Sequence, residues 1–318
     1  MVLWSLFFLA MLAVAINAYV RPQLEFAGRL LGKAKMHYIA RAGVRRAIIE
    51  AESDETKEYD SLYDSWSTND AAFSNVPFGG GAFSVVKPAP PGESKPQYGL
   101  TDEESKININ KASHDVLKNL FEKEAGVEPK EADVIADSIL DWIDEDDSLH
   151  KDGREDDYYQ LLIEPYPCKN GAFEAIEELL LVAGMTREIF DKVKDIITIY
   201  GDGMVNVNTA GVRVLEALGL SKEAAEGIIS FRAGQNSKKE GEVPDNVFMD
   251  ASAIVNILKE AGVSDEGGSL TRAASMLGVK SYNFRGTVAG SLARLGRSET
   301  ITFVYGRNDK LIKYWREE

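Results

Sequence analysis

The residues with the most obvious chemical potential form one acidic stretch, from Asp141 to Asp157. It reads DWIDEDDSLHKDGREDD and holds nine carboxylates and two basic residues. Carboxylates crowded this closely repel one another and raise each other's pKa unless a cation compensates. Ca²⁺ prefers carboxylate and carbonyl oxygen ligands, so it is the cation that such a loop would suit best.

The spacing of these acids does not match a known calcium loop. An EF-hand places its carboxylates at alternate positions, has Gly at the sixth and ends on Glu. Residues 141–157 have the amino-acid composition of an EF-hand loop but not its spacing of carboxylates. Three interpretations stay open: a solvated acidic loop, a pair of carboxylates for glycoside hydrolysis, or a Ca²⁺ site. The candidate ligands for that site are Asp141, Asp144, Asp146, Asp147, Glu155 and Asp156.

Other site chemistry finds little support in the sequence. The 318 residues include one cysteine, Cys168, and three histidines, so no intrachain disulfide can form and zinc or Cys–His chemistry has few residues to use. No P-loop, G-x-S-x-G, H-E-x-x-H or dinucleotide fingerprint is present. The formal net charge of −15 disfavours nucleic acid as a partner, because an acidic surface repels phosphates. We therefore expect a protein that is not an enzyme.

The N-terminus predicts a single long helix with two different halves. Residues 1–20 (MVLWSLFFLAMLAVAINAYV) are almost wholly apolar. About 20 such residues span the roughly 30 Å hydrocarbon core of a bilayer. Residues 21–53 keep an apolar period of three and four and become amphipathic, with Pro22 at the junction. The apolar half thus reads as a transmembrane segment, and the amphipathic half as its extension. A generic membrane anchor with a juxtamembrane coil is the alternative.

The charges around the span bear on its orientation. Arg21, Arg29, Lys33 and Lys35 follow the apolar run, and the positive-inside rule alone would leave the bulk of the chain in the cytoplasm. A short basic leader upstream, as pilin-like precursors carry, would restore an outward orientation. Either such a leader precedes this sequence, or the chain is not a precursor of that kind.

An internal repeat dominates the middle of the chain. ININ-KASHDVLKNL from Ile107 matches VNVN-TAGVRVLEAL from Val205 at a constant offset of 98 residues. In each copy an Asn-x-Asn segment precedes a helix with a Val-Leu-Leu stripe, and a tight turn leads to a second helix. We expect Asn110 or Asn208 to act as the helix N-cap. Each helix–turn–helix unit resembles the helix-hairpin-helix or SAM-like fold.

Short strands flank this repeat on both sides. Phe73 to Val86, interrupted by three glycines at 79–81, predicts a hairpin, and residues 88–92 (PAPPG) predict a linker. Residues 280–290, 300–305 and 310–316 predict three further strands that return to the same sheet. The expected domains are 1–20, the transmembrane half; 21–53, the amphipathic half; 54–105, the first β region; 106–270, a helical domain of two related halves; and 271–318, the C-terminal strands.

Five features in this order resemble the K-type minor pseudopilin family of bacterial type II secretion (general secretion pathway protein K). The first is the pilin-like start, in which Ser5 and Leu6 stand where other pilins carry Glu. The others are GLTDEESKININKAS, IADSILDWIDEDD, GREDDYY and VNVNTA, at residues 99–113, 135–147, 153–159 and 205–210. The resemblance covers nearly the whole chain.

The resemblance implies a fold, a place and partners. The fold would be α+β, with a long N-terminal pilin-like transmembrane helix, a small antiparallel sheet and a large inserted all-helical domain of two SAM-like halves. The protein would be single-pass in the inner membrane, in contact with its lipid and with the inner-membrane secretion platform, and the bulk of the chain would lie in the periplasm. It would act at the tip of the pseudopilus with the I- and J-type minor pseudopilins and bind Ca²⁺ through acidic residues.

A membrane-anchored DNA-binding protein of the competence type is the alternative function. Its helix-hairpin-helix units present the backbone N–H groups of a Gly-x-Gly turn to phosphate. The corresponding turns here, at Gly126 and Gly219, have one glycine each, and Glu128 stands where a phosphate would bind. A salt-dependent gel shift would separate the two functions.

Overall fold

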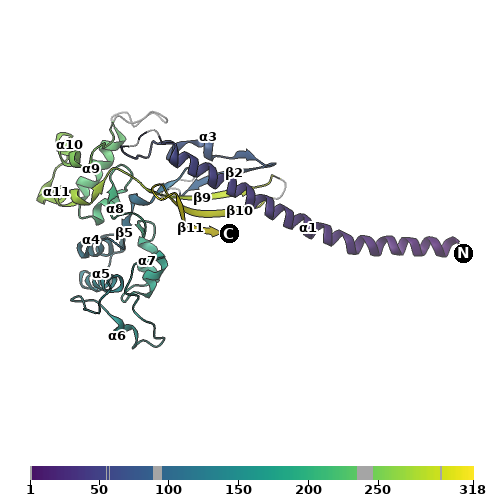
Figure 1. Ribbon diagram of the computed structural model, residues 1–318, viewed down its shortest axis with the longest axis horizontal. Coiled ribbons are helices and arrows are strands. Elements are labelled where there is room, and N and C mark those ends of the chain that lie inside the picture. The colour runs from purple at the N-terminus through teal and green to yellow at the C-terminus, as the bar shows by residue number, and fades with distance from the viewer. Residues whose placement is uncertain (1, 55, 57, 89–94, 235–245, 294–295) are drawn as a thin grey trace.

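The computed structural model describes residues 2–54, 56, 58–88, 95–234, 246–293 and 296–318. Helix α1 (Val2–Glu52) is continuous and passes through Pro22. Its N-terminal half projects from the rest of the molecule as a long rod that changes direction part-way along (Figure 1). Residues 2–31 are all exposed, which at 1.5 Å per residue is about 45 Å of uncovered helix. This segment contains the one candidate membrane span among the described residues.

The second half of α1 packs across a sheet. Its buried positions recur at steps of three and four: Met36, Ile39, Ala40, Gly43, Val44, Ala47 and Ala51. Small residues let the helix approach the strands closely. A Cβ on Gly290 of the sheet would lie 2.3 Å from the carbonyl oxygen of Met36, so only glycine fits there.

The sheet is antiparallel and has seven strands. Its path is β1-β2-β9-β10-β11, with β3 paired to β2 and β4 paired to β9. Gly79 and Gly80 both have positive φ and form the β1–β2 turn, as the sequence predicted. The C-terminal strands return to this sheet, also as predicted. The strands are β1 (Val76–Phe78), β2 (Gly81–Lys87), β3 (Gln97–Tyr98), β4 (Thr101–Asp102), β9 (Asn283–Ser291), β10 (Ser298–Gly306) and β11 (Leu311–Glu317).

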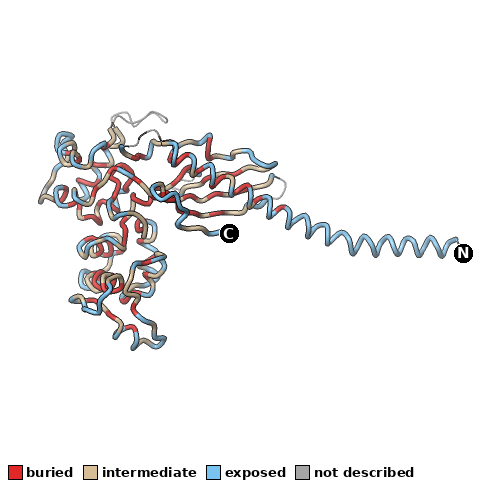
Figure 2. The backbone as a smooth tube through the Cα atoms, in the orientation of Figure 1, coloured by how far each residue is buried: buried red, intermediate tan, exposed pale blue. Residues whose placement is uncertain are grey.

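The core of this first part lies between α1 and the sheet. Two short helices, α2 (Ser65–Thr68) and α3 (Asp70–Phe73), add Trp66 and Phe73 to it. Trp66 packs on Phe284 of β9 with ring centroids 5.0 Å apart. In Figure 2 buried residues mark this core and a second one in the helical part, while residues 2–31 of α1 are exposed.

The second core belongs to a helical part inserted between β4 and β9. Two short parallel strand pairs, β5–β6 and β7–β8, accompany its helices. The elements are η1 (Glu103–Ser105), β5 (Ile107–Asn108), α4 (His114–Asn119), η2 (Leu120–Glu124), α5 (Pro129–Ile143), α6 (Asp156–Tyr159), η3 (Ile176–Leu181), α7 (Arg187–Val193), β6 (Ile197–Thr198), β7 (Val205–Asn206), α8 (Val212–Ala217), α9 (Lys222–Ala233), η4 (Ala251–Ala253), α10 (Ile254–Glu260), η5 (Glu266–Gly268), α11 (Ser269–Ala273), η6 (Ala274–Met276) and β8 (Leu277–Gly278).

The sequence repeat corresponds to a structural repeat. In each copy the first asparagine accepts a hydrogen bond from the backbone N–H of the second: Asn108 from Asn110, and Asn206 from Asn208. The predicted N-cap role of Asn110 or Asn208 is wrong. Three residues separate each asparagine from its helix, so the N-cap positions are Ser113 for α4 and Gly211 for α8, and neither makes a side-chain capping hydrogen bond.

The helical part extends further along the chain than its predicted boundary. The strand pairing of the helical part continues to Gly278, past the expected limit at residue 270. The predicted linker at residues 88–92 lies, apart from Pro88, outside the described residues.

Candidate functional site

The acidic stretch begins on the last turn of α5. This helix buries an apolar stripe that includes Ile135, Ile139 and Trp142, and this packing fixes the side of the helix that carries Asp141. Asp141 is fully buried, although it is a carboxylate. A charge in such a position requires partners.

One oxygen of Asp141 has partners and the other has none. Oδ1 accepts from the backbone N–H of His150 at 2.9 Å and lies 2.5 Å from His150 Nδ1. Burial of the imidazole disfavours its charge, but the hydrogen bond to Asp141 and the nearby carboxylates outweigh this and raise the pKa of His150. Oδ2 of Asp141 is buried without a hydrogen-bond partner.

Further oxygens around Asp141 are buried and unsatisfied. They are Oδ1 of Asp144, both carboxylate oxygens of Glu155 and Oδ1 of Asn170. Glu155 is only 7% exposed, and burial together with Asp141, Asp144 and Asp147 raises its pKa to about 7. Buried polar atoms in native proteins are nearly always paired, so a group of unpaired hard oxygens fits a cation of the Ca²⁺ type.

The structure separates the six predicted ligands into two groups. Asp141, Asp144 and Glu155 carry the unsatisfied oxygens. The other three have protein partners: Asp146 accepts from the N–H of Ser148, Asp147 from the side chain of Asn170, and Asp156 from the N–H of Cys168.

Two nearby residues were missed from the sequence. Asn170 lies outside the acidic stretch and brings a carbonyl oxygen without any charge to signal it. Gly153 provides space: a Cβ there would lie 1.9 Å from Oδ2 of Asp141. Its position in the stretch as a lone glycine among acids was the only available signal.

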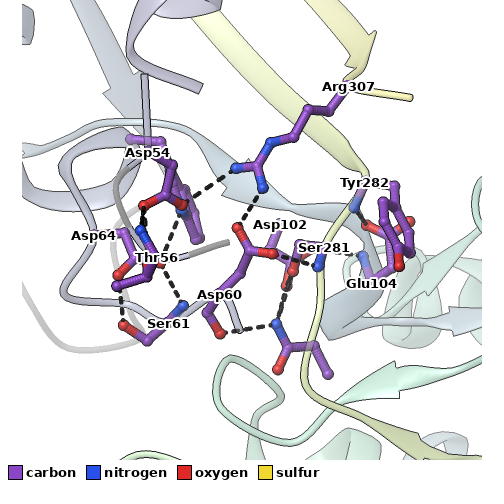
Figure 3. Close-up of polar contacts among 12 residues, drawn as sticks. Asp54, Thr56, Asp60, Ser61, Asp64, Asp102, Glu104, Ser281, Tyr282 and Arg307 are labelled. Carbon is purple, nitrogen blue, oxygen red and sulfur yellow. Dashed lines mark hydrogen bonds and ion pairs between the residues drawn. The ribbon is translucent and has the colours of Figure 1, made fainter. Parts of the chain in front are cut away.

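A second carboxylate cluster lies where the sheet meets the helical part (Figure 3). Asp54, Asp60 and Asp64 offer oxygens within 4.8 Å of one another. Arg307 already supplies a cation here, 2.7 Å from Asp60 and 3.4 Å from Asp54. Asp64 accepts from Ser61 and Trp66. Because these carboxylates already have protein partners, we interpret the cluster as a structural ion-pair network.

The neighbouring carboxylate Asp102 joins the sheet to the second copy of the repeat. It is buried and accepts from Ser281 Oγ at 2.6 Å, from Thr209 Oγ1 at 2.5 Å and from Asn206 Nδ2 at 3.4 Å. Burial, and then the charge of Glu104, raise the pKa of Asp102 well above its usual value. Burial likewise raises the pKa of Asp60 to about 7, against the opposing effect of Arg307.

Glu103 links the sheet to the first half of the helical part. Its carboxylate accepts from Thr198 Oγ1 on β6, and from Arg285 Nε on β9 at 2.6 Å. Burial alone would raise the pKa of Glu103, but Lys106 and Arg285 outweigh it and hold the pKa at about 2. Consecutive residues Asp102 and Glu103 therefore fix both halves of the helical part to the sheet. We call the region formed by Asp60, Asp102, Glu103, Arg307 and their partners the joint.

Known proteins are similar in sequence to the part of the chain that carries these residues. Residues 98–202, which include Asp102, Glu103, the first repeat copy and the acidic stretch, match the family described as type II secretion system (T2SS), protein K. A type II secretion system protein K from Aeromonas hydrophila is 25% identical over 199 residues, covering 60% of this chain and 55% of the relative. One from Pectobacterium carotovorum subsp. carotovorum is 33% identical over 96 residues, covering 30% of this chain and 28% of the relative.

The fold also matches a solved structure. The chain superimposes on one protein chain of the crystal structure of the GspK-GspI-GspJ complex from the enterotoxigenic Escherichia coli type 2 secretion system. The TM-score is 0.63 at 18% sequence identity, covering 94% of this chain and 99% of that one. The α+β architecture predicted from the sequence, a pilin-like part with an inserted helical domain, is thereby confirmed.

The matches to the curated relatives span 55% and 28% of their lengths, and both relatives have the same description. None of the comparisons supports the DNA-binding alternative. The matched segment contains three of the five features on which the resemblance was based, at residues 99–113, 135–147 and 153–159. Over residues 98–202 the chain is therefore similar to the type II secretion system protein K family, and both curated relatives have that description.

Proposed function

We propose that this chain is a minor pseudopilin at the tip of the type II secretion pseudopilus, where it supports assembly initiation and protein export across the outer membrane. The apolar half of α1 would anchor it as a single-pass protein in the inner membrane, in contact with lipid and with the secretion platform. The sheet and helical part would lie in the periplasm. Its partners would be the I- and J-type minor pseudopilins.

The observation that carries this proposal is the division of α1. Residues 2–31 are all exposed, whereas residues 36–51 form one wall of a folded core. Such a rod exposes about 45 Å of apolar or amphipathic surface, which lipid or other helices must cover. The role that follows is structural and involves no catalysis. The inserted helical part lies at the far end of the molecule from the rod's start (Figure 1) and would obstruct addition of a subunit above it.

We also propose that the acidic stretch binds Ca²⁺ through Asp141, Asp144 and Glu155, with Asn170 contributing its carbonyl oxygen. The support is the set of buried oxygens without protein partners. The ion would neutralise carboxylates that otherwise repel one another, and so stabilise the loop between α5 and α6. The remaining acids of the stretch would hold the loop's shape through their own hydrogen bonds.

The test is assembly of the full-length chain in detergent with the I- and J-type minor pseudopilins of its own secretion system. We expect a stable complex on size exclusion, and restored secretion when the chain is returned to a strain that lacks it. A chain that remains monomeric beside both proteins, and leaves secretion unrestored, would refute the proposal. The same assembly experiment in the presence of a chelator tests separately whether complex formation requires Ca²⁺.

A further inference from the structure

Asn170 is the one asparagine in the sequence that is followed directly by glycine. In an Asn-Gly pair the glycine backbone nitrogen can attack the side-chain carbonyl carbon of the asparagine, because glycine has no Cβ to hinder the approach. The proton of that nitrogen passes through solvent to the side-chain amide, which leaves as ammonia, and a five-membered succinimide ring forms. Water then opens the ring to aspartate or isoaspartate. The sequence therefore places a site of spontaneous modification shortly after the acidic stretch.

Two hydrogen bonds hold the Asn-Gly pair, and residues of the acidic stretch accept both of them. The Gly171 N–H donates to the Trp142 carbonyl oxygen at 3.1 Å, and Asn170 Nδ2 donates to Asp147 Oδ1 at 3.2 Å. To react, the Gly171 nitrogen must give up its proton and meet the Asn170 side chain. This movement breaks the first bond and disturbs the second, so the closed acidic stretch opposes the reaction.

The charge state of the acidic stretch should control how often these bonds open. Trp142 directly follows Asp141, whose Oδ2 is buried without a partner, and both carboxylate oxygens of Glu155 are in the same condition. Repulsion between such carboxylates opposes the closed loop, and a bound cation removes it. A loop opens locally with a free energy of its own, smaller than that of global unfolding. Loss of the cation should therefore release Gly171 more often while the rest of the chain stays folded.

The backbone at Asn170 accommodates the aspartate product. Asn170 has a φ of 47°, in the left-handed region where asparagine and aspartate occur more often than most other residues. Its Oδ1 is buried without a hydrogen-bond partner, as are the free oxygens of the proposed Ca²⁺ site. An aspartate here would lose the donor that now serves Asp147 and would add a negative charge. That charge increases repulsion in the absence of an ion and strengthens the ligation of Ca²⁺ in its presence.

We propose that Asn170–Gly171 is a deamidation site whose rate is set by the acidic stretch, slow while the stretch is closed around a cation and faster after the cation leaves. A chain modified to aspartate holds one more carboxylate at the site and binds Ca²⁺ more tightly. Chains that lose the ion are thereby converted, irreversibly, to a form that retains it better. The inference rests on the proposed Ca²⁺ site and adds a covalent reaction to it.

Peptide mass spectrometry of the full-length chain in detergent measures the rate. The chain is incubated with Ca²⁺, with a chelator or in denaturant, and the peptide that contains Asn170 is analysed for the mass change from amide to acid. We expect the slowest conversion with Ca²⁺, at least tenfold faster conversion in denaturant, and an intermediate rate with chelator. Equal rates with Ca²⁺ and with chelator would overturn control by the acidic stretch, and so would a rate that is highest with Ca²⁺.

Variants at three positions check the chemistry. Gly171→Ala hinders the attacking nitrogen and should slow conversion at least tenfold, while the nearest atom to the new methyl group, the Lys169 carbonyl oxygen at 3.8 Å, leaves the fold undisturbed. Asp147→Ala frees the Asn170 side chain and should speed conversion in Ca²⁺. Asp146→Ala, the matched control, removes an acid that bonds to the Ser148 N–H instead and should leave the rate unchanged. If Gly171→Ala converts as fast as the unmodified chain, no succinimide forms and the proposal falls.

Asn170→Asp tests the consequence of the modification, because it supplies the aspartate product directly. Its Ca²⁺ dissociation constant in isothermal titration calorimetry should fall at least fivefold, and its melting temperature in chelator should lie below that of the unmodified chain. Unchanged or weaker Ca²⁺ binding would overturn the tightening. If the unmodified chain binds Ca²⁺ but its conversion does not respond to chelator, the deamidation inference falls and the Ca²⁺ site stands. If calorimetry detects no Ca²⁺ binding, both fall.

Discussion

The side-chain amide of Asn208 forms two hydrogen bonds with the main chain of Phe248. Its Oδ1 accepts from the Phe248 N–H at 2.9 Å, and its Nδ2 donates to the Phe248 carbonyl at 2.9 Å. In the first copy of the repeat, Asn110 holds Phe173 in the same way, at 2.7 and 3.0 Å. Each asparagine thus ties a buried aromatic residue of a distant segment to the start of its repeat unit.

Replacing Asn208 by alanine should destabilise the chain by about 3 kcal/mol, because a buried donor and a buried acceptor each lose their partner. The melting temperature of the full chain in detergent measures the loss, and hydrogen exchange at Phe248 should rise. Asn256→Ala, at an exposed position of α10, is the control and should change little. Equal stability of the two variants would show that the amide pair does not support the core.

These contacts show what sequence could not predict. The repeat offset of 98 residues located both asparagines, but their partners lie 63 and 40 residues further on, so the repeat register does not identify them. Patterns that depend on neighbouring residues were predicted correctly, such as the long helix, the glycine turn and the C-terminal strands. Burial was not. Asp102 and Glu103 read as two members of an acidic run and are buried at the joint.

The same limit applies to the acidic stretch. The sequence identifies nine carboxylates but cannot distinguish Glu155, which is buried and unpaired, from Asp156, which accepts from the Cys168 N–H. That distinction depends on how the segment after α6 folds back, which brings residues 168–170 beside the loop. The neutral ligand candidate Asn170 has no charge pattern to reveal it.

Removing a proposed Ca²⁺ ligand should weaken binding selectively. We expect Glu155→Gln and Asp141→Asn to raise the Ca²⁺ dissociation constant at least tenfold in isothermal titration calorimetry. Asp146→Asn, an exposed acid of the same loop, should change it less than twofold. At 100 times the dissociation constant, Ca²⁺ should stabilise the unmodified chain by about 2.7 kcal/mol relative to chelator. Equal affinities for all the variants would exclude this ligand set.

Gly153 offers a test that leaves every carboxylate in place. Gly153→Ala would put a methyl group 1.9 Å from the Asp141 Oδ2, so either the loop or Asp141 must move. We expect weaker Ca²⁺ binding and a lower melting temperature. Gly171→Ala is the matched control, because the nearest atom to its Cβ, the Lys169 carbonyl oxygen, is at 3.8 Å. Normal Ca²⁺ affinity in Gly153→Ala would show that Asp141 is not a ligand of the Ca²⁺ site.

The joint should make stability depend on pH. The pKa of Asp60 rises on folding from 3.8 to about 7 because burial disfavours the charged form. Between these values the folded chain holds more protons than the unfolded chain, so this group stabilises the fold at low pH and its contribution is lost as pH rises towards 7. The limiting slope is about 1.4 kcal/mol per pH unit.

Asp60→Asn should flatten this dependence, since the amide oxygen can still accept from the Ser281 N–H and cannot ionise. Melting temperatures from pH 4 to pH 7, at saturating Ca²⁺ to suppress titration of Glu155, provide the measurement. Parallel curves for the variant and the unmodified chain would contradict the role of Asp60.

The insertion point has a consequence for how freely the length of the helical part can change. The chain leaves the sheet after Asp102 and rejoins it at Asn283, and these two positions flank a directly paired stretch of β4 and β9. In topological terms everything between them is the loop of a single β-hairpin. The entropy of closing a loop grows only slowly with its length. The helical part can therefore gain or lose whole segments over evolutionary time while the strands that support it keep their register.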